Sequence, residues 1–182
     1  MASSRGLGRA CAEALAREGV EVVVNGRTES DVRTTAESIA SKYTVSAIPV
    51  VGDSSTPEVH DALLAACPEP DIVLLNGEGP PPRPFTNISE EDWEESTRKT
   101  MISPLLFVQR IVTGMQERRF GRIVAACPIV SSCHKFTTFV RFWCKRWCKL
   151  VQAGLLHRSG VVGSRGDVLL VFDVLGIQGQ GG

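Results

Sequence analysis

The sequence predicts an α/β protein built on a doubly wound parallel sheet, and three observations carry that prediction. A glycine-rich loop at residues 2–8 runs directly into a helical pattern. Apolar segments of strand length then alternate with helical patterns as far as about residue 125, which is the arrangement of strands that pair in parallel. These strands end in polar tips, where open parallel sheets bind their ligands. At 182 residues the chain can bury one sizeable core.

The expected elements follow one another closely up to that point. In order, we expect helix 9–17, strand 20–24, helix 30–42, strand 45–51, helix 56–67, strand 71–75, helix 89–117 and a strand that begins at 122. The second of these helices has an inward stripe at helical spacing, made of Val32, Ala36, Ile39 and Ala40. The strands are mostly apolar, as strands buried on both faces are.

Capping residues mark the starts of two helices, and a proline interrupts the longest one. Thr56 can cap its helix with its hydroxyl, and Pro57 suits the first turn. Ser89 and Asp92 have the spacing of a capping box at the start of the long helix. Pro104 should bend or break that helix, because proline lacks the backbone N–H that a helix interior needs.

The composition changes abruptly near residue 118, although the net formal charge of the whole chain is zero. Half of the 20 Lys and Arg residues follow this point, where Asp167 and Asp173 are the only acids. The same part holds most of the cysteines, namely Cys127, Cys133, Cys144 and Cys148. Such a change inside one globular domain is unusual. We therefore expect a cofactor-binding domain at residues 1–125 and a basic tail, containing cysteine and aromatic residues, at residues 126–182.

The N-terminal loop has the composition of a phosphate-binding turn. Gly6 and Gly8 let the backbone approach a pyrophosphate, whose charge the following helix N-terminus stabilises. Ser3 and Ser4 can donate hydrogen bonds from their hydroxyls. Such loops are also common as plain turns into helices, so the specificity comes from the strand and helix that follow. The motif needs a preceding strand, and because none is present we expect the N-terminus to be truncated.

The tip of strand 20–24 predicts which nicotinamide cofactor the loop binds. Asn25 stands where the ribose-reading side chain is expected, about 20 residues after the loop. An acid there would bind the 2′-hydroxyl of NAD and repel a 2′-phosphate. Arg5 and Arg27 are instead placed to meet a phosphate. The sequence therefore favours NADP(H) over NAD(H), and the alternative is two surface arginines on a structural turn.

A series of short motifs occurs in a characteristic order over about residues 1–125. The series is Ser-Ser-Arg-Gly-Leu-Gly-Arg-Ala, Val-Val-Val-Asn-Gly-Arg, Gly-Asp-Ser-Ser, Asp-Ile-Val-Leu-Leu-Asn-Gly and Gly-Arg-Ile-Val. It resembles the short-chain dehydrogenase/reductase family, and within it the 3-oxoacyl-(acyl carrier protein) reductases. The resemblance implies a nicotinamide cofactor, the reduction of a carbonyl and a Rossmann-type fold. We expect that fold to be incomplete, with its first strand missing and its C-terminal third atypical.

The resemblance also implies roles for residues at matching positions. The turn that contains Gly6 and Gly8 would bind the pyrophosphate of the cofactor. Asp53, beside Ser54, would contact the adenine. Asn76 and Gly77 would lie on the ribose side. For Asp53 and Asn76 the alternative is a plain turn at the end of a strand.

The residues that carry out the family's reaction are not found at their positions. That reaction uses a tyrosine with a lysine four residues later, which lowers the tyrosine's pKa, together with a serine and an asparagine. The only tyrosine is Tyr43, far too early in the chain, and Ala47 stands four residues later. Thr100 occupies the asparagine position, while Ser131 and Ser132 come too late for the serine. We therefore assign no catalytic residue.

The tail after residue 125 has several interpretations, of which a shifted reading frame, a different terminal exon or a fusion is favoured. A strand is expected over residues 168–175.

The tail also contains side chains that could bind a metal, but their spacing matches no usual zinc pattern, so no metal is expected. These residues are Cys133, His134, Cys144 and Cys148. Residues 134–149 interleave basic and aromatic side chains that could bind nucleic acid or an anionic membrane. His60 and His157 are expected to be solvated helix and loop residues.

The expected function is an NADP(H)-dependent carbonyl or 3-oxoacyl reductase whose catalysis is impaired in this chain. The alternatives are a non-catalytic cofactor-binding or interaction protein, and a non-functional fragment. The expected partners are the nicotinamide cofactor, a small carbonyl or acyl thioester if the chain is active, and further copies of the chain, but not nucleic acid. No signal peptide or apolar run of membrane-spanning length is visible, and free thiols suit a reducing cytoplasm.

Overall fold

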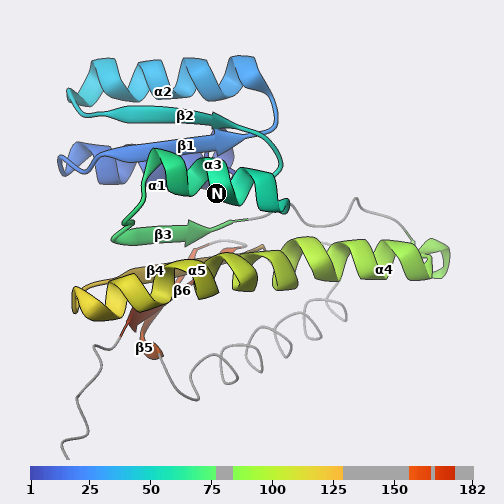
Figure 1. Cartoon of the computed structure of the whole chain (residues 1–182). Helices are drawn as coiled ribbons and strands as arrows, with labels where there is room; N and C mark the ends of the chain where they lie inside the picture. Colours follow the sequence, from blue (N-terminus) through green and yellow to red (C-terminus); the bar gives the residue numbers. More distant parts are fainter. Residues whose placement is uncertain (77–83, 129–155, 165–166, 175–182) are drawn as a thin grey trace, which may run out of the picture. The chain divides into compact units, whose positions relative to one another are not determined.

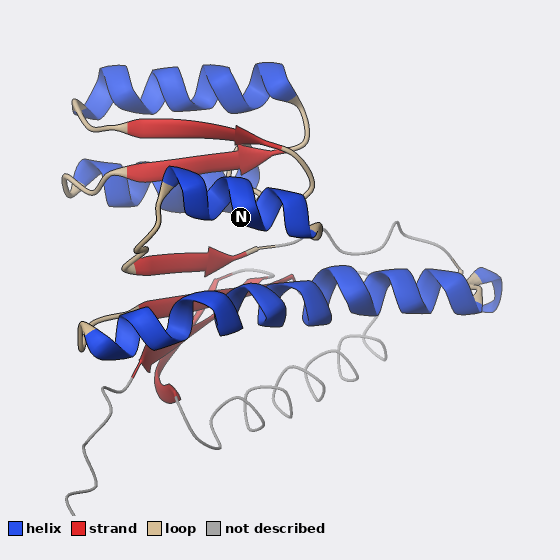
Figure 2. Cartoon of the chain, viewed as in Figure 1, coloured by secondary structure: helices blue, strands red, loops and turns tan. Residues whose placement is uncertain are grey.

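Helices and strands alternate along the described part of the chain as far as residue 128, as predicted (Figure 2). The computed structural model describes residues 1–76, 84–128, 156–164 and 167–174. Its elements are α1 (Gly6–Arg17), β1 (Val22–Gly26), α2 (Glu29–Tyr43), β2 (Ala47–Val51), α3 (Pro57–Ala66), β3 (Ile72–Leu75), a 3-10 turn (Phe85–Asn87), α4 (Glu90–Thr97), a π turn (Arg98–Ile102), α5 (Ser103–Glu117), β4 (Arg122–Pro128), β5 (Leu156–Ser164) and β6 (Asp167–Val174). No helix among them combines the length and the apolar character that crossing a membrane requires.

Residues 1–69 and the described residues between 76 and 109 form one compact unit around a parallel pair of strands. In that pair β1 and β2 run side by side over their whole lengths. α2 lies alongside both strands (Figure 1), and α1 contacts α2 and β1. The aliphatic core of this unit consists of Ala12, Ala16, Val22, Val24, Val32, Ala36 and Ile39. Burial of each Val or Ile side chain contributes about 1.5–3 kcal/mol, which holds the N-terminus of α1 beside the tip of β1.

The two helix starts predicted from capping residues are confirmed, and the proline has a local effect. The Thr56 side chain accepts a hydrogen bond from the Val59 N–H at the start of α3. Ser89 and Asp92 form the predicted capping box at the start of α4. The long helix continues past Pro104, but only through the π turn that immediately precedes α5. A wider turn relieves the clash between the proline ring and the preceding carbonyls.

The residues at 70–75 and the described residues from 110 onward belong to a second compact unit. Its strands form a sheet in the order β3-β4-β6-β5. β3 and β4 pair in parallel, as predicted, whereas β6 runs antiparallel to both β4 and β5. The strand expected over residues 168–175 is confirmed as β6. β4 runs across residue 125 without a break, and the division of the chain at that residue stays a prediction.

β5 is a strand that the sequence did not predict, and it places His157 on a strand instead of in a loop. Gly160 and Gly163 interrupt its apolar residues, and its register shifts between Arg158 and Gly160. Glycine disfavours strands and often marks bulges. The strand therefore forms because β6 supplies backbone partners along its length, a contact that local propensity does not reveal.

Candidate cofactor-binding site

The N-terminal loop is tied to the tip of β1 by reciprocal hydrogen bonds. The Ser3 N–H donates to the Asn25 carbonyl at 2.7 Å, and the Asn25 N–H donates to the Ser3 hydroxyl at 2.9 Å. The Ala2 N–H donates to the side-chain oxygen of Asn25 at 3.1 Å. Both Ser3 and Asn25 are buried. Since buried polar groups are costly to leave unpaired, these bonds hold the loop in one position against the strand.

The side chain of Asn25 also joins the loop to the end of β2. Its amide nitrogen donates to the Val50 carbonyl at 3.1 Å and to the Gly52 carbonyl at 3.2 Å. Only 1% of the residue is exposed. The expected contact of this side chain with a ribose does not fit that geometry, because the amide is buried and already bonded on both its oxygen and its nitrogen. Asn25 instead positions the three segments that surround the site.

Two glycines permit close approaches that a side chain would block. A Cβ on Gly8 would lie 2.1 Å from the Ala2 carbonyl oxygen and 3.0 Å from the Asn76 amide nitrogen. A Cβ on Gly26 would lie 2.4 Å from the Ser4 hydroxyl oxygen. Gly26 is a site residue that sequence reasoning missed, although its place at the tip of β1 was a signal. Both glycines let the loop pack tightly against its neighbours.

The N-terminus of α1 is open to an acceptor. The helix begins at Gly6, not at Arg9 as predicted, so Gly6 and Gly8 both lie in its first turn. The N-cap residue, Arg5, makes no capping hydrogen bond with its side chain, and the first turn holds no acid. The first backbone N–H groups of a helix have no intrahelical partner and favour an anion. This end of α1 therefore suits a phosphate group.

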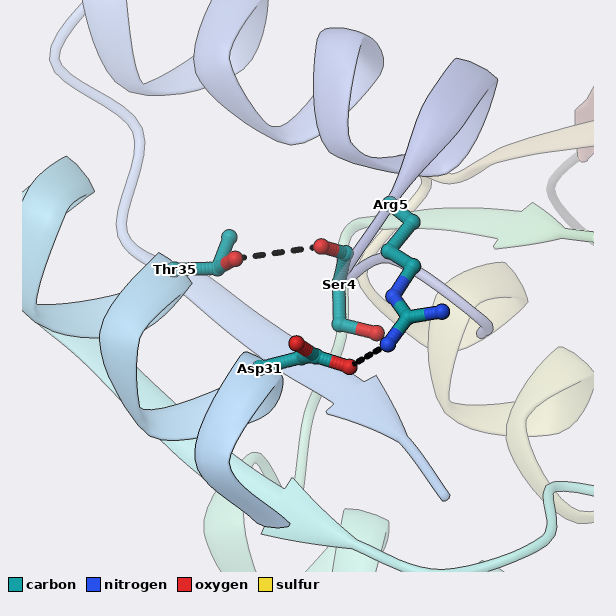
Figure 3. Close-up of polar contacts among 4 residues, drawn as sticks. All are labelled: Ser4, Arg5, Asp31 and Thr35. Atoms are coloured by element: carbon teal, nitrogen blue, oxygen red, sulfur yellow. Dashed lines mark hydrogen bonds and ion pairs between the residues drawn. The ribbon is translucent and has the colours of Figure 1, made fainter. Parts of the chain in front are cut away.

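α2 holds the loop through two contacts that lie one helical turn apart (Figure 3). The Thr35 hydroxyl donates to the Ser4 carbonyl at 3.1 Å. One turn earlier, Asp31 forms an ion pair with the guanidinium of Arg5. The Arg5 side chain remains 73% exposed, and Arg27 is exposed just before α2 begins. The two predicted phosphate-binding arginines therefore both present their side chains to solvent.

The segment after β2 places an ionised acid close to Arg27. Burial raises the pKa of the Asp53 carboxyl, but hydrogen bonds from Ser55 and the charges of Lys99 and Arg27 outweigh it and leave that pKa below its usual value. The Ser55 N–H donates to the carboxylate at 2.9 Å. Ser54 contributes its backbone carbonyl to a neighbouring cluster. Asp53 is therefore charged at neutral pH.

That neighbouring cluster surrounds His60, which is buried with 4% of its surface exposed. The prediction of a solvated histidine is wrong. Its Nε2 lies 2.9 Å from the Ser54 carbonyl oxygen and 3.2 Å from the Ser103 hydroxyl oxygen, and its ring meets Phe107 edge-on at a centroid distance of 5.0 Å. Residues more than 40 positions later cover it, so local sequence hides its burial. The available signal was its place three residues before Leu63 on the buried face of α3.

The serine and histidine of this cluster do not form a nucleophilic pair. A carbonyl oxygen only accepts, so the Nε2 of His60 carries the proton and donates to Ser54. The Ser103 hydroxyl donates to the Ser55 carbonyl at 2.9 Å. Both donors are therefore directed at backbone carbonyls, and Ser103 is also buried. We call this set, Ser54, Ser55, His60, Ser103 and Phe107, the His60 cluster, and its geometry is that of a structural connection between the start of α5 and the loop before α3.

The predicted ribose-side residues lie only partly in the described chain. The Asn76 side-chain nitrogen donates to the Ala2 carbonyl at 3.0 Å, so Asn76 contacts the same loop as Asn25. Gly77 lies outside the described residues. Of these two residues, the described structure therefore places Asn76 against the predicted phosphate-binding loop.

The residues considered for the family's catalytic roles do not lie together in the described part of the chain. Tyr43 is the last residue of α2, with the Lys42 amine 5.1 Å from its ring centroid. The Thr100 hydroxyl donates to the Ser96 carbonyl at 2.6 Å inside the helical segment. Ser131 and Ser132 lie outside the described residues, as do the metal-capable cysteines and the basic aromatic segment 134–149. Within the described ranges no cluster of His, Cys, Asp or Glu has the make-up of a metal site.

Known proteins share both sequence and fold with this chain. An L-sorbose reductase from Gluconobacter frateurii, solved with NADPH and L-sorbose, has a TM-score of 0.69 at 23% identity over 82% of this chain and 61% of that one. This likeness confirms the predicted Rossmann-type α/β class over the part that the two proteins share. Such an identity speaks for the fold alone.

The sequence relatives are reductases and dehydrogenase-like proteins that are longer than this chain. A 3-oxoacyl-[acyl-carrier-protein] reductase of Aquifex aeolicus is 30% identical over 132 residues, covering 70% of this chain and 53% of that protein. The inactive hydroxysteroid dehydrogenase-like protein 1 of Pongo abelii is 34% identical over 124 residues, covering 65% of this chain and 38% of that protein. The chain thus spans about half, or less, of the length of these relatives.

The family itself is established by a match to most of the chain. The model of the short chain dehydrogenase family matches residues 1–139. This match includes the loop, β1 to β4 and every helix described above. The chain therefore belongs to the short-chain dehydrogenase family, as the resemblance of its motifs implied.

Proposed function

We propose that this chain binds NADP(H) through the loop before α1, and that its own catalysis of carbonyl reduction is impaired. The observation that carries the proposal is the open N-terminus of α1 behind a loop that Ser3 and Asn25 hold in place. A fixed loop that leads into a helix N-terminus without a side-chain cap is pre-organised for a pyrophosphate. Such a site binds its ligand without first ordering a mobile segment.

The exposed arginines support the phosphorylated form of the cofactor. Arg5 and Arg27 flank the start of α2 and present cationic groups to solvent. A guanidinium binds phosphate through charge-assisted, often bidentate hydrogen bonds. The L-sorbose reductase that shares the fold was solved with NADPH, which agrees with this choice. Asn25 helps indirectly in this proposal, because it positions the loop from which Arg5 extends.

The catalytic part of the proposal rests on the residues that the chain offers. Bound NADPH would supply a hydride to a carbonyl, and a proton donor must then complete the reduction. Tyr43, the only tyrosine, is at the far end of α2 from Asp31 and the loop. A relative of 34% identity is named an inactive dehydrogenase-like protein. These observations favour cofactor binding without efficient turnover.

Titration of the purified chain with NADPH, followed by the cofactor's fluorescence, tests binding, and NADPH oxidation with an acetoacetyl thioester tests turnover. We expect saturable binding and no turnover above background. Gly8→Ala should remove binding, because its Cβ would meet the Ala2 carbonyl at 2.1 Å. Gly114→Ala is the matched control, since that Cβ lies in α5 and meets only the end of the Arg118 side chain, at 3.2 Å.

The outcomes separate the two parts of the proposal. Binding that survives Gly8→Ala, or no binding by the wild-type chain, would show that the loop is not a cofactor site. Turnover at a rate typical of reductases, roughly 1 s⁻¹ or more, would show that catalysis is intact. In that case the reductase function, with a small carbonyl or acyl thioester as substrate, replaces the impaired one.

The same proposal includes a cellular location and an assembly. Cys11 and Cys67 form no disulfide in the described part of the chain, which supports a reducing cytoplasm. A homo-oligomer and a division of the chain at residue 125 are proposed on the family resemblance and the composition change. Light scattering of the purified chain tests the assembly, and a monomer at all concentrations would exclude it.

A further inference from the structure

An acid of α2 pairs with Arg5, and the proposed function does not use this contact. The carboxylate of Asp31, in the first turn of α2, pairs with Nη2 of Arg5 (Figure 3). Thr35 holds the backbone of the neighbouring Ser4 from the next turn of the same helix. The guanidinium that the proposed function assigns to a phosphate therefore already has an anionic partner.

Helix stability accounts for an acid in this turn, but not for its contact with Arg5. Acids in the first turn stabilise a helix through its dipole, and α2 has both Glu29 and Asp31 there. Glu29 satisfies that role while pairing with Arg33 on its own helix at 2.8 Å. Asp31 differs because its carboxylate reaches the loop that contains Arg5. The two acids form a natural pair for comparison.

The ion pair is weak enough for a ligand to displace. The side chains of Arg5 and Asp31 are 73% and 30% exposed, and solvent screens exposed pairs strongly. A phosphate group carries more charge than a carboxylate and offers three acceptor oxygens. It can therefore take the guanidinium from Asp31, but the displaced carboxylate stays on α2 and repels the ligand.

We propose that Asp31 is a specificity-determining residue that competes with the 2′-phosphate of NADP(H) for Arg5. The inference rests on the proposed cofactor site. Its consequence is a chain with a smaller preference for NADP(H) over NAD(H) than its two arginines alone would produce. NAD(H), which lacks the 2′-phosphate, does not compete with Asp31 for Arg5 and is indifferent to this pair.

The test compares NADPH and NADH affinities of Asp31→Asn and Glu29→Gln, each by fluorescence titration. Both substitutions remove one negative charge from the same helical turn, but only Asp31→Asn releases Arg5. We expect Asp31→Asn to tighten NADPH binding about three- to fivefold, which is the upper part of the scale of an exposed charge interaction. NADH affinity should change less than about twofold. Glu29→Gln should leave both affinities within about twofold.

A second pair of variants shows whether the effect passes through Arg5. Arg5→Ala should weaken NADPH binding. In that background, Asp31→Asn should increase NADPH affinity by less than half as much as it does when Arg5 is present. Asp31→Ser repeats the test with a smaller side chain, should the amide make a new contact. Circular dichroism of each variant checks that α2 remains folded.

The results distinguish a failure of the proposed role of Asp31 from a failure of the proposed cofactor site. Equal changes for NADPH and NADH, equal effects of Asp31→Asn and Glu29→Gln, or a full gain without Arg5 would overturn the role of Asp31 and leave the cofactor site intact. Tighter NADPH binding that requires Arg5 supports it. Absence of saturable binding by the wild-type chain and by Asp31→Asn overturns both.

Discussion

Two polar clusters in the same compact unit differ in burial. The buried cluster is placed to stabilise the fold, whereas the exposed pair is placed to contact a ligand. The His60 cluster is closed to solvent, with His60 and Ser103 almost fully buried. The pair of Arg5 and Asp31 connects the loop to α2 but lies largely in solvent. Both link segments that are distant in sequence. Only the second has groups that a ligand can reach.

The free-energy cost of breaking a hydrogen bond or an ion pair therefore depends on how deeply it is buried. A buried donor or acceptor that loses its partner keeps the full cost of its desolvation. An exposed charge that loses its partner returns to water at almost no cost. The His60 cluster should therefore govern the free energy of unfolding, and the Arg5–Asp31 pair should govern the affinity for an anion.

The largest effect on the free energy of unfolding is expected from removing the His60 side chain from the buried cluster. His60→Ala removes the donor to the Ser54 carbonyl and the ring that packs on Phe107. We expect a loss of about 2–4 kcal/mol in the free energy of unfolding, measured by urea denaturation. Ser103→Ala should cost less, and the double variant less than the sum, because the two side chains share one cluster. A loss below about 1 kcal/mol for His60→Ala would contradict a buried structural role.

An intermediate effect is expected at Asp53, and it depends on pH. The folded-state pKa of this carboxyl lies below its usual value. Its charge therefore stabilises the fold above the unfolded pKa of about 3.9, and this contribution is lost as the pH falls through the folded pKa. Asp53→Asn keeps an acceptor for the Ser55 N–H and removes only the charge. It should cost at most about 1 kcal/mol at pH 7, after solvent screening.

Acid titration of wild type and Asp53→Asn, followed by thermal unfolding, checks the sign of that effect. The difference between the two proteins should shrink toward zero as the pH falls through the folded-state pKa of Asp53. A difference that persists unchanged in acid would mean that packing, and not charge, is responsible.

The smallest effect on stability is expected from the exposed pair. Arg5→Ala should change the free energy of unfolding by about 0.5 kcal/mol or less, even though it weakens NADPH binding in the proposed site. Urea denaturation beside the titration measures both quantities on one variant. A loss as large as that of His60→Ala would show that burial does not distinguish the two clusters.

Much of the local structure was predictable because its causes are local. The caps at Thr56 and Ser89 act within one helical turn, and the π turn before Pro104 follows from the geometry of one ring. The apolar stripe of α2 was confirmed except at Ala40, which is half-buried, while Thr35 is buried in its stead. Thr35 is buried because the Ser4 carbonyl accepts from its hydroxyl, a partner from another element.

The candidate site was predicted in its location but not in its roles. The residues predicted around the loop do gather there: hydrogen bonds and one ion pair join Ser3, Ser4, Arg5, Asn25 and Asn76 to the loop or to α2. The sequence could not show that Asn25 is buried, because its partners are the backbone of the N-terminal loop and of the end of β2, more than 20 residues away. Nor could it show that Asp31 reaches Arg5.

The sequence by itself determined the alternation of helices and strands as far as β4 and the capped starts of α3 and α4, because spacing and capping act over a few residues. Only the tertiary structure decided that Asn25 is a buried connector, that His60 is part of a closed cluster and that β5 forms beside β6. These outcomes depend on partners tens of residues away, whose burial sets the cost of every polar group. The same distance explains why Asp31, unremarkable as a helix-start acid, becomes the partner of the arginine expected to bind a phosphate.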